Sequence, residues 1–362
     1  MMKKSISLLV LVLIALSMSA QSDFDIAQSF MNKKGIKLVP NERSTTRGTD
    51  TSYSVFNGEN NKGFAIVVNG CVVGYDTNNT ANEDDMPCCM KELLDMYSKT
   101  VKPSRTRGLS EGETKAIEPI IKTQWNQCSP YNDSIAQKTN ICFFVAEAQI
   151  LHYYKVNYYY EQHFFYSNLP VDLYPTTFDH DLIDREGEEG WAEETARFFK
   201  YVLHGDNASY FSHNFEDIFG IKKDEINFSA NDSRYDIYDE LLENGTPIII
   251  SSPNHFFIVD GRSEDGRYHV NFGWGGYCDG YYVFPDTEND KQNIETNFEY
   301  NRDTYYWVLY YTSVNEKASI NPIMCVQTNN AVYNLQGIKV GNSLEGLPKG
   351  VYIQNKKKYI VK

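Results

Sequence analysis

The order in which helical and strand-like patterns occur constrains the fold of this chain more than any other feature. Between about residues 117 and 313, apolar residues recur at helical spacing in three segments, at 142–154, 191–203 and 236–243. Strand-like segments rich in β-branched and aromatic residues come late in this stretch: "TPIIISS", "HFFIVDG", "RYHVNFG", "GYYVFP" and "TYYWVLYYT". Helices followed by antiparallel strands are typical of an α+β domain and not of a doubly wound parallel sheet. We therefore predict an α+β fold.

A smaller unit is predicted before this domain. Residues 52–76 alternate β-branched and aromatic residues around the turn-forming residues 58–61, which predicts an antiparallel β-meander. The segment that follows has apolar residues at helical spacing: Met90, Leu93, Leu94, Tyr97 and Val101. The polar segment 102–115, "KPSRTRGLSEGETK", shows no periodicity and is the best candidate for a linker.

The two ends of the chain have patterns of their own. Lys3 and Lys4 precede an apolar stretch from residue 6 to about residue 16, and small residues then lead to Ala20. This arrangement is typical of a secretory signal peptide, so we expect an exported protein, secreted or held at the cell surface. No later apolar run approaches the ~20 residues of a membrane-spanning helix, and we expect no membrane span. Residues 331–362 contain short strand-like segments with Gly turns, which predict a small β-rich appendage.

Charge and cysteine content exclude several classes of function. The chain has 34 Lys and Arg residues against 48 Asp and Glu residues, a formal net charge of −14. It lacks the basic surface that binds phosphate backbones, so nucleic acid is not an expected partner. The seven cysteines are irregularly spaced and odd in number, so at least one is not paired within the chain. The neighbouring Cys88 and Cys89 lack the spacing of a zinc site, and we expect no metal.

One cysteine differs from the other six in its local context. In "TNICFFVAEAQILH", residues 139–152, Thr139 or Asn140 can cap a helix whose first turn contains Cys142. Unpaired N–H groups and the positive end of the helix dipole favour a thiolate at that position. A single cysteine in an apolar run is more often a buried, inert residue. The residues that could work with Cys142 therefore decide between the two interpretations.

Residues that could work with Cys142 occur both after it and before it in the chain. His255 begins a predicted strand, and Asn271 occupies the corresponding point of the next strand, so its amide can orient the imidazole. Trp274, in the following Gly-rich turn, is predicted to lie over this pair, although a buried indole is also an ordinary core residue. Gln127 is a candidate donor to the oxyanion that forms when a thiolate attacks a carbonyl. His152 and His269 are interpreted as structural histidines.

Four segments that carry these residues resemble the signature blocks of the streptopain-like cysteine peptidases, a secreted bacterial branch of the papain-like fold. They are "TQWNQCSPYN", "CFFVAEAQILHYYKV", "NHFFIVDG" and "YHVNFGWGGYCDGYYVF". The resemblance implies that Cys142 is the nucleophile, His255 the base, Asn271 the orienting amide and Gln127 the oxyanion donor. It implies no cofactor, and it implies protein or peptide substrates.

The resemblance extends beyond this domain and divides the chain. The upstream unit is similar to the family's inhibitory propeptide, and the tail resembles the C-terminal sorting modules of exported bacterial proteins. The expected division is a signal peptide at 1–20, an inhibitory prodomain and linker at 21–112, a cysteine peptidase domain at 113–318 and a β-rich tail at 319–362. In this division the prodomain is an intramolecular inhibitor of the peptidase.

The sequence also departs from the family pattern next to the proposed nucleophile and base. Bulky residues stand where the family has small ones, at Ile141, Phe143, Phe144 and Phe256, and Asn254 stands before His255. Two hypotheses follow. The first is a secreted cysteine endopeptidase made as a zymogen. The second is a catalytically weak or inactive homologue that binds proteins or peptides.

Overall fold

The computed structural model describes the chain in segments that include both predicted domains. The described residues are 22–40, 53–82, 86–87, 90–91, 94, 97–98, 115–135, 141–166, 169–211, 215–226, 234–252, 255–283, 308–313, 332–334, 339–341, 343, 350–354 and 357–361. The predicted signal peptide and the predicted caps Thr139 and Asn140 lie outside these residues, as does most of the predicted linker.

The bounds of the described helices and strands are as follows. The helices are α2 (Asp23–Asn32), the 3-10 turn η1 (Glu59–Asn61), α4 (Cys142–Tyr153), α5 (His180–Ile183), α6 (Trp191–Phe211), α7 (Phe215–Phe219) and α8 (Arg234–Glu243). The N-terminal and central strands are β1 (Tyr53–Asn57), β2 (Phe64–Val68), β3 (Cys71–Asp76), β4 (Gln162–Tyr166), β5 (Leu169–Leu173), β6 (Ile221–Glu225), β7 (Ile248–Ser252) and β8 (His255–Arg262). The later strands are β9 (Tyr268–Asn271), β10 (Gly280–Tyr282), β11 (Val308–Ser313), β12 (Val332–Asn334), β13 (Lys339–Gly341), β14 (Gly350–Gln354) and β15 (Lys357–Val361).

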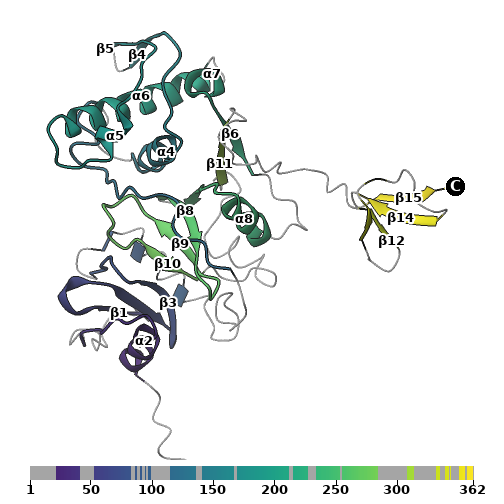
Figure 1. Cartoon of the computed structure of the whole chain (residues 1–362). Helices are drawn as coiled ribbons and strands as arrows, with labels where there is room; N and C mark the ends of the chain where they lie inside the picture. Colours follow the sequence, from purple (N-terminus) through teal and green to yellow (C-terminus); the bar gives the residue numbers. More distant parts are fainter. Residues whose placement is uncertain are drawn as a thin grey trace, which may run out of the picture.

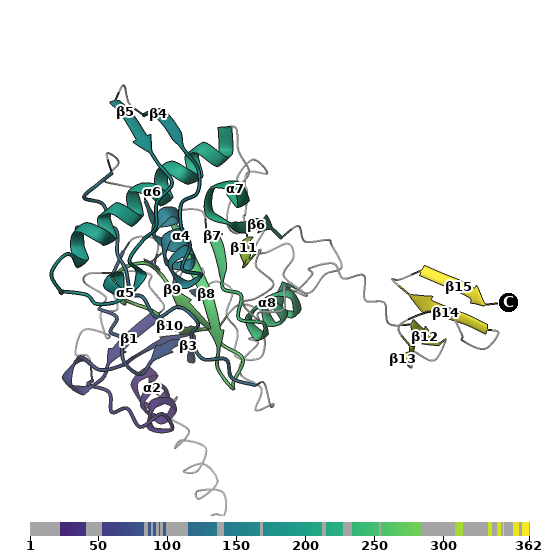
Figure 2. The same cartoon turned by 45° about the horizontal axis from the view of Figure 1, so that its top comes forward.

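A single antiparallel sheet organises the molecule. Its order is β1-β2-β3-β10-β9-β8-β7-β11-β6, so the meander β1 to β3 is hydrogen-bonded to the edge strand β10 of the later strands. The predicted α+β fold is confirmed, with α4, α5, α6 and α7 gathered at one end and α2 at the other (Figure 1). The predicted β-rich tail forms a separate four-stranded sheet of β12 to β15 (Figure 2).

The alternation of side chains along the strands produces distinct cores on the faces of this sheet. On β7 and β8, Ile249 and Ile258 pack with α4 and α6, whereas Ile248, Ile250 and Val259 pack on the opposite face with α8. On the meander, a third core lies against α2 and includes residues of β2 and β3. The nucleophile helix predicted from sequence is therefore held against one face of β8 by a continuous apolar layer.

Some elements differ from the sequence predictions. Helix α2 was not predicted, although Ser22 accepts from the backbone N–H of Asp25 and Asp25 reaches back to Ser22, a capping box. The hairpin of β4 and β5 was also not predicted. A helix was predicted near residues 90–101. Of its predicted apolar residues, Met90, Leu94 and Tyr97 are buried, and Leu93 and Val101 lie outside the described residues.

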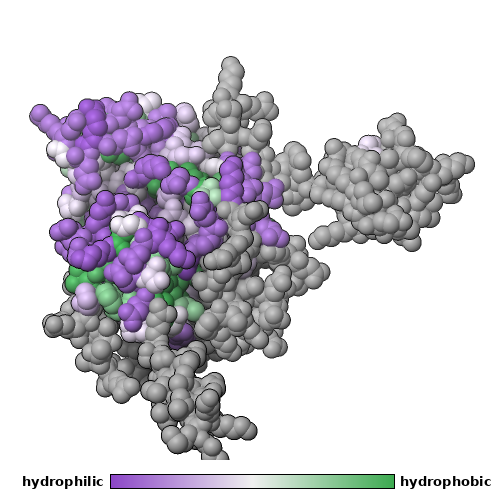
Figure 3. Space-filling model, turned by 60° about the horizontal axis from the view of Figure 1, so that its bottom comes forward, coloured by the Kyte–Doolittle hydropathy of each residue, from purple (hydrophilic) through white to green (hydrophobic). Residues whose placement is uncertain are grey.

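The surface of the described part of the chain is mostly polar. Large exposed hydrophobic side chains among these residues are Val39, Tyr159 and Tyr174. Figure 3 shows hydrophilic residues over most of the described surface of one face, with hydrophobic residues in small areas between them. Across the segments that the structure describes, every helix is too short or too polar to cross a membrane.

Candidate active site

Cys142 is the first residue of α4, as the sequence predicted. Ile141 occupies the N-cap position and supplies no side-chain hydrogen bond, while its carbonyl accepts from the N–H of Val145 at 3.0 Å. Ile141 is fully buried and Cys142 is partly exposed. The thiol therefore lies at the positive end of a helix whose position is fixed by the core, and reagents can reach it.

His255 is the first residue of β8 and is 5% exposed. Its imidazole stacks on the Trp274 indole, with ring centroids 4.7 Å apart, which agrees with the placement predicted for Trp274. Its Nε2 lies 2.7 Å from the carbonyl oxygen of Phe272, and a carbonyl can only accept, so Nε2 carries the hydrogen and Nδ1 is the basic nitrogen. Burial lowers the pKa of His255 to about 4, against the raising effect of this hydrogen bond. The ring is thus neutral at pH 7, as a general base must be.

The thiol and the imidazole are carried by segments that lie side by side. Helix α4 packs against β8. Phe143, which follows Cys142, meets Phe256, which follows His255, edge to face with ring centroids 5.2 Å apart. Both phenylalanines are partly exposed at the rim of the first core. The structure therefore brings the first turn of α4 and the start of β8 together at one place on the surface.

Asn271 lies at the end of β9, and its amide is fully engaged with neighbouring groups. Its Nδ2 donates to the carbonyl of Thr123 at 2.9 Å, and its Oδ1 accepts from the N–H of Gly273 at 3.0 Å. It also exchanges two hydrogen bonds of 3.2 Å with the amide of Gln149. Asn271 thus fixes the turn after β9, whose Phe272 carbonyl holds His255. Direct orientation of the imidazole by the Asn271 amide stays a prediction.

Gln127 is partly buried and lies at a bend in the irregular segment before α4. Its carbonyl accepts from Nδ2 of Asn132 at 2.9 Å. Two residues upstream, the carbonyl of Trp125 accepts from the N–H of Gly275 at 3.0 Å, which ties the segment to the turn that carries Trp274. The structure therefore places Gln127 next to a segment anchored at the site, and its role as oxyanion donor stays a prediction.

Two buried polar residues of the site were missed by the sequence analysis. Gln149 interrupts an apolar stretch of α4 seven residues after Cys142, and that spacing on a helix was a signal that could have found it. Asp279 is 1% exposed and its Oδ1 accepts from the N–H of Phe272 at 2.8 Å. Because Phe272 also presents the carbonyl that binds His255, Asp279 helps to hold this residue in place behind the imidazole.

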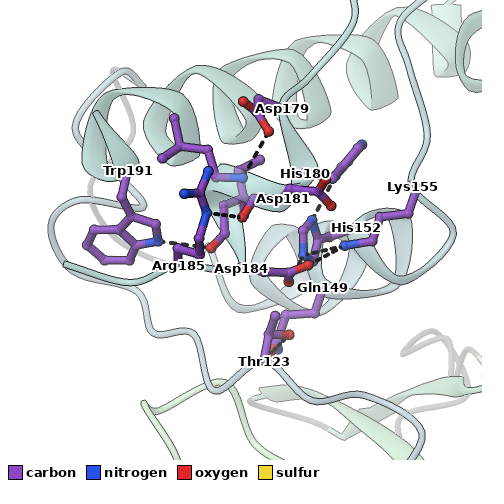
Figure 4. Close-up of polar contacts among 12 residues, drawn as sticks. Thr123, Gln149, His152, Lys155, Asp179, His180, Asp181, Asp184, Arg185 and Trp191 are labelled. Atoms are coloured by element: carbon purple, nitrogen blue, oxygen red, sulfur yellow. Dashed lines mark hydrogen bonds and ion pairs between the residues drawn. The ribbon is translucent and has the colours of Figure 1, made fainter. Parts of the chain in front are cut away.

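A pocket of about 610 Å³ lies next to this region and is lined by residues 120–125 and by side chains of α4 that include Gln149 and His152 (Figure 4). Cys142 and His255 do not line it. His152 contacts Asp184 through Nε2 at 2.6 Å and His180 through Nδ1 at 2.8 Å. His152 is thus held in place by neighbouring side chains, which agrees with its structural interpretation.

Comparisons with known proteins relate the sequence and the fold to known peptidases. Residues 125–282 match the sequence model of the Peptidase C10 family. A search of curated proteins found no match. Among solved structures, the chain resembles a fragment of prointerpain A from Prevotella intermedia, at 18% sequence identity over 76% of this chain and 98% of that chain, with a TM-score of 0.52. It also matches the active wild-type interpain A cysteine protease of that organism at 18% identity over 59% and 97% of the two chains, with a TM-score of 0.36.

The first of these structures supports the fold, and the family match supports the chemistry. The matched range contains all five predicted site residues: Gln127, Cys142, His255, Asn271 and Trp274. The predicted resemblance to the streptopain family is therefore confirmed. Residues 125–282 thus carry the sequence features of the Peptidase C10 family of cysteine peptidases.

Proposed function

We propose that the chain is a secreted cysteine endopeptidase made as a zymogen. The observation that carries the proposal is the position of Cys142 at the start of α4, partly exposed and next to the strand that begins with a neutral His255. In this proposal, Nδ1 of His255 takes the thiol proton and the thiolate attacks a peptide carbonyl. His255 then protonates the leaving amine, and water hydrolyses the thioester.

The oxyanion formed in this attack needs hydrogen-bond donors. The backbone N–H of Cys142 is one candidate, because the first N–H groups of a helix have no partner within the helix. The side-chain amide of Gln127 is the second. Asn271 keeps the turn after β9 in place, and the Phe272 carbonyl keeps the hydrogen of His255 on Nε2.

The N-terminal unit is proposed as the inhibitory prodomain. It supplies β3, which pairs with β10, and Tyr75 of β3 stacks on Tyr281 of β10 with ring centroids 5.4 Å apart. This attachment supports a unit that stays on the peptidase until the predicted linker, near residues 105–113, is cut. The predicted signal peptide supports export of the proenzyme.

The test uses the reduced chain, with and without limited proteolysis, and a fluorescently labelled denatured protein as substrate. Hydrolysis that is lost in Cys142→Ala supports the proposal. A drop of at least about 100-fold in kcat is expected for His255→Ala, since general-base catalysis contributes on this order. Hydrolysis that survives in Cys142→Ala contradicts the proposal.

The ring contact between Phe143 and Phe256 favours one second candidate, a binding protein on the same scaffold. Two large side chains meet next to the thiol, where bulk can close a substrate cleft. A chain that binds the labelled protein in a pull-down, with neither hydrolysis nor alkylation of Cys142, supports this candidate over the enzyme.

A further inference from the structure

Gln149 lies on the face of α4 that also carries the proposed nucleophile. Seven residues separate it from Cys142, which is two helical turns, or about 10.5 Å along the axis. Between them on this face, Val145 packs against the turn after β9: a Cβ built on Gly273 would lie 3.1 Å from Cγ1 of Val145. Gln149 is 1% exposed, so its amide must find partners within the protein.

These partners belong to two other segments of the site. The Oε1 of Gln149 accepts from Oγ1 of Thr123 at 2.9 Å and from the N–H of Trp125 at 3.3 Å. With Asn271 of β9, the amide forms a reciprocal pair of bonds, each 3.2 Å. Figure 4 shows Gln149 reaching from α4 toward Thr123. One side chain thus joins the helix of Cys142, the segment that leads to Gln127 and the end of β9.

The hydrogen-bond pattern allows a single orientation of both amides. A flipped Asn271 would direct its NH₂ group at the N–H of Gly273 and its oxygen at the carbonyl of Thr123. A flipped Gln149 would direct its NH₂ group at the N–H of Trp125. Each flip brings two donors or two acceptors together in a buried place, which is costly. Backbone groups of Thr123 and Gly273 therefore set the Asn271 amide, the N–H of Trp125 sets the Gln149 amide, and the two amides meet as complementary donors and acceptors.

We propose that Gln149 is a positioning residue of the peptidase site, which sets Asn271 and the Gln127 segment relative to Cys142 on α4. The inference rests on the proposed function. The Nε2 donor of Gln149 is the group of α4 that bonds Oδ1 of Asn271, so the positioning role is assigned to this donor. A displacement of about 1 Å in such a site costs about 100-fold in rate.

Two variants separate positioning from simple support of the fold. Gln149→Glu has the same shape, but its carboxylate repels Oδ1 of Asn271 when ionised and donates to it when protonated. Gln149→Met also has a similar shape and neither accepts nor donates strongly at any pH. Ile150→Val, which removes one buried methyl group from another face of α4, is the matched control for general loosening of the helix.

The measurement is kcat and KM of the reduced, proteolysed full chain between about pH 5 and about pH 8, each expressed as a ratio to the unsubstituted protein. We expect kcat of Gln149→Glu to be about 100-fold low at the upper pH, with KM changed much less. Its kcat ratio rises at least about tenfold toward the lower pH as the carboxyl group is protonated. The ratio for Gln149→Met stays low and flat, and Ile150→Val stays within about twofold throughout.

The rate at which iodoacetamide alkylates Cys142, read by peptide mass, provides a second readout that needs no turnover. If the unsubstituted chain does not hydrolyse protein but Gln149→Glu changes the pH profile of alkylation, the proposed function fails and the positioning role stands. If hydrolysis depends on Cys142 but the kcat ratio of Gln149→Glu is flat with pH, or both variants match the unsubstituted chain, the positioning role is wrong.

Discussion

Phe143 and Phe256 are two of the bulky residues that the sequence places beside Cys142 and His255. They do not bury the nucleophile, because Cys142 remains partly exposed; they pack on each other edge to face at 5.2 Å. Phe143 also lies under the ammonium group of Lys223, 4.8 Å from its ring centroid. The bulky side chains beside the thiol therefore pack against each other and against Lys223. This arrangement leaves Cys142 partly exposed, which is compatible with a reactive cysteine.

Phe256→Ala is expected to open the approach to the thiol. Removing this ring deletes the contact with Phe143, so a bulky maleimide should alkylate Cys142 about five times faster, on the scale of one lost aromatic contact. Iodoacetamide, which is small, should react within about twofold of the unsubstituted rate. Phe257→Ala, on the opposite face of the same strand, is the control, and an equal acceleration there would contradict this explanation.

Asp279 predicts a measurable pH dependence of stability. Burial raises its pKa from the ordinary 3.8 to about 7, so the folded chain holds this proton more tightly than the unfolded chain. The stability that this buried carboxyl group contributes is fully present below its ordinary pKa of 3.8 and is lost as the pH rises through about 7. Asp279→Asn keeps an oxygen for the N–H of Phe272 and does not titrate. Its stability relative to the unsubstituted chain should rise by about 3 kcal/mol between about pH 5 and about pH 8.

Urea unfolding at the two pH values measures this difference. Asp181→Asn, at an exposed position on α5, serves as the control. A gain in stability of Asp279→Asn that is the same at both pH values would show that the folded-state carboxyl is not held protonated.

At the scale of elements, α4 is anchored to β6 and β11 by a buried charge. Glu147 is 0% exposed and accepts from Nζ of Lys223 at 2.8 Å and from the hydroxyl of Tyr311 at 2.7 Å. These contacts fix the face of α4 that does not carry Cys142. Because a buried carboxylate is costly without its partner, removing Lys223 alone is expected to destabilise this arrangement.

Lys223→Met should lower the free energy of unfolding by about 3–5 kcal/mol, because it leaves the carboxylate of Glu147 buried without its cation. Glu147→Gln combined with Lys223→Met removes both charges and should recover most of this loss. Thermal unfolding of the single and double variants provides the measurement. A double variant no more stable than Lys223→Met would show that the charge is not what anchors the helix.

The elements near the site were the easiest to predict. The apolar run of 142–154 placed α4 to within one residue, because every residue from Val145 to His152 is buried and the helix is apolar on most of its sides. Helix α2 was missed although its Ser22 and Asp25 form a capping box and its apolar residues lie mainly on one face; the helix has ten residues, of which only Ala27 and Met31 are buried. The spacing of Gln149 from Cys142 on α4 was a local signal, but its role depends on Asn271, 122 residues away, and the role of Asp279 depends on a turn that no local pattern marks.

At the scale of the whole molecule, the N-terminal unit and the peptidase domain share one sheet. The sequence predicted two units and gave no sign of the pairing between β3 and β10, because strands about 200 residues apart leave no common periodicity. The contact is close: a Cβ on Gly74 would lie 2.5 Å from Cε1 of the buried Tyr282 ring. Glycine at 74 is therefore what lets the two strands pair.

Gly74→Val should weaken this joint and separate the two parts after the predicted linker is cut with trypsin. The pieces of the unsubstituted chain should elute together in gel filtration, whereas those of Gly74→Val should elute apart. Val72→Ala, whose side chain packs within the N-terminal unit, is the matched control and should elute as one complex. Separation of the unsubstituted pieces would show that the shared sheet does not hold them.

The central claim is that Cys142 is a nucleophile activated by His255. The most direct measurement is covalent labelling of the reduced, proteolysed chain with a peptidyl epoxide, followed by peptide mass analysis, with the exposed Cys128 as an internal reference. We expect one label on Cys142, formed at least about 100-fold more slowly in His255→Ala, and little label on Cys128. Equal labelling of the two cysteines, or a rate at Cys142 that does not change in His255→Ala, would contradict it.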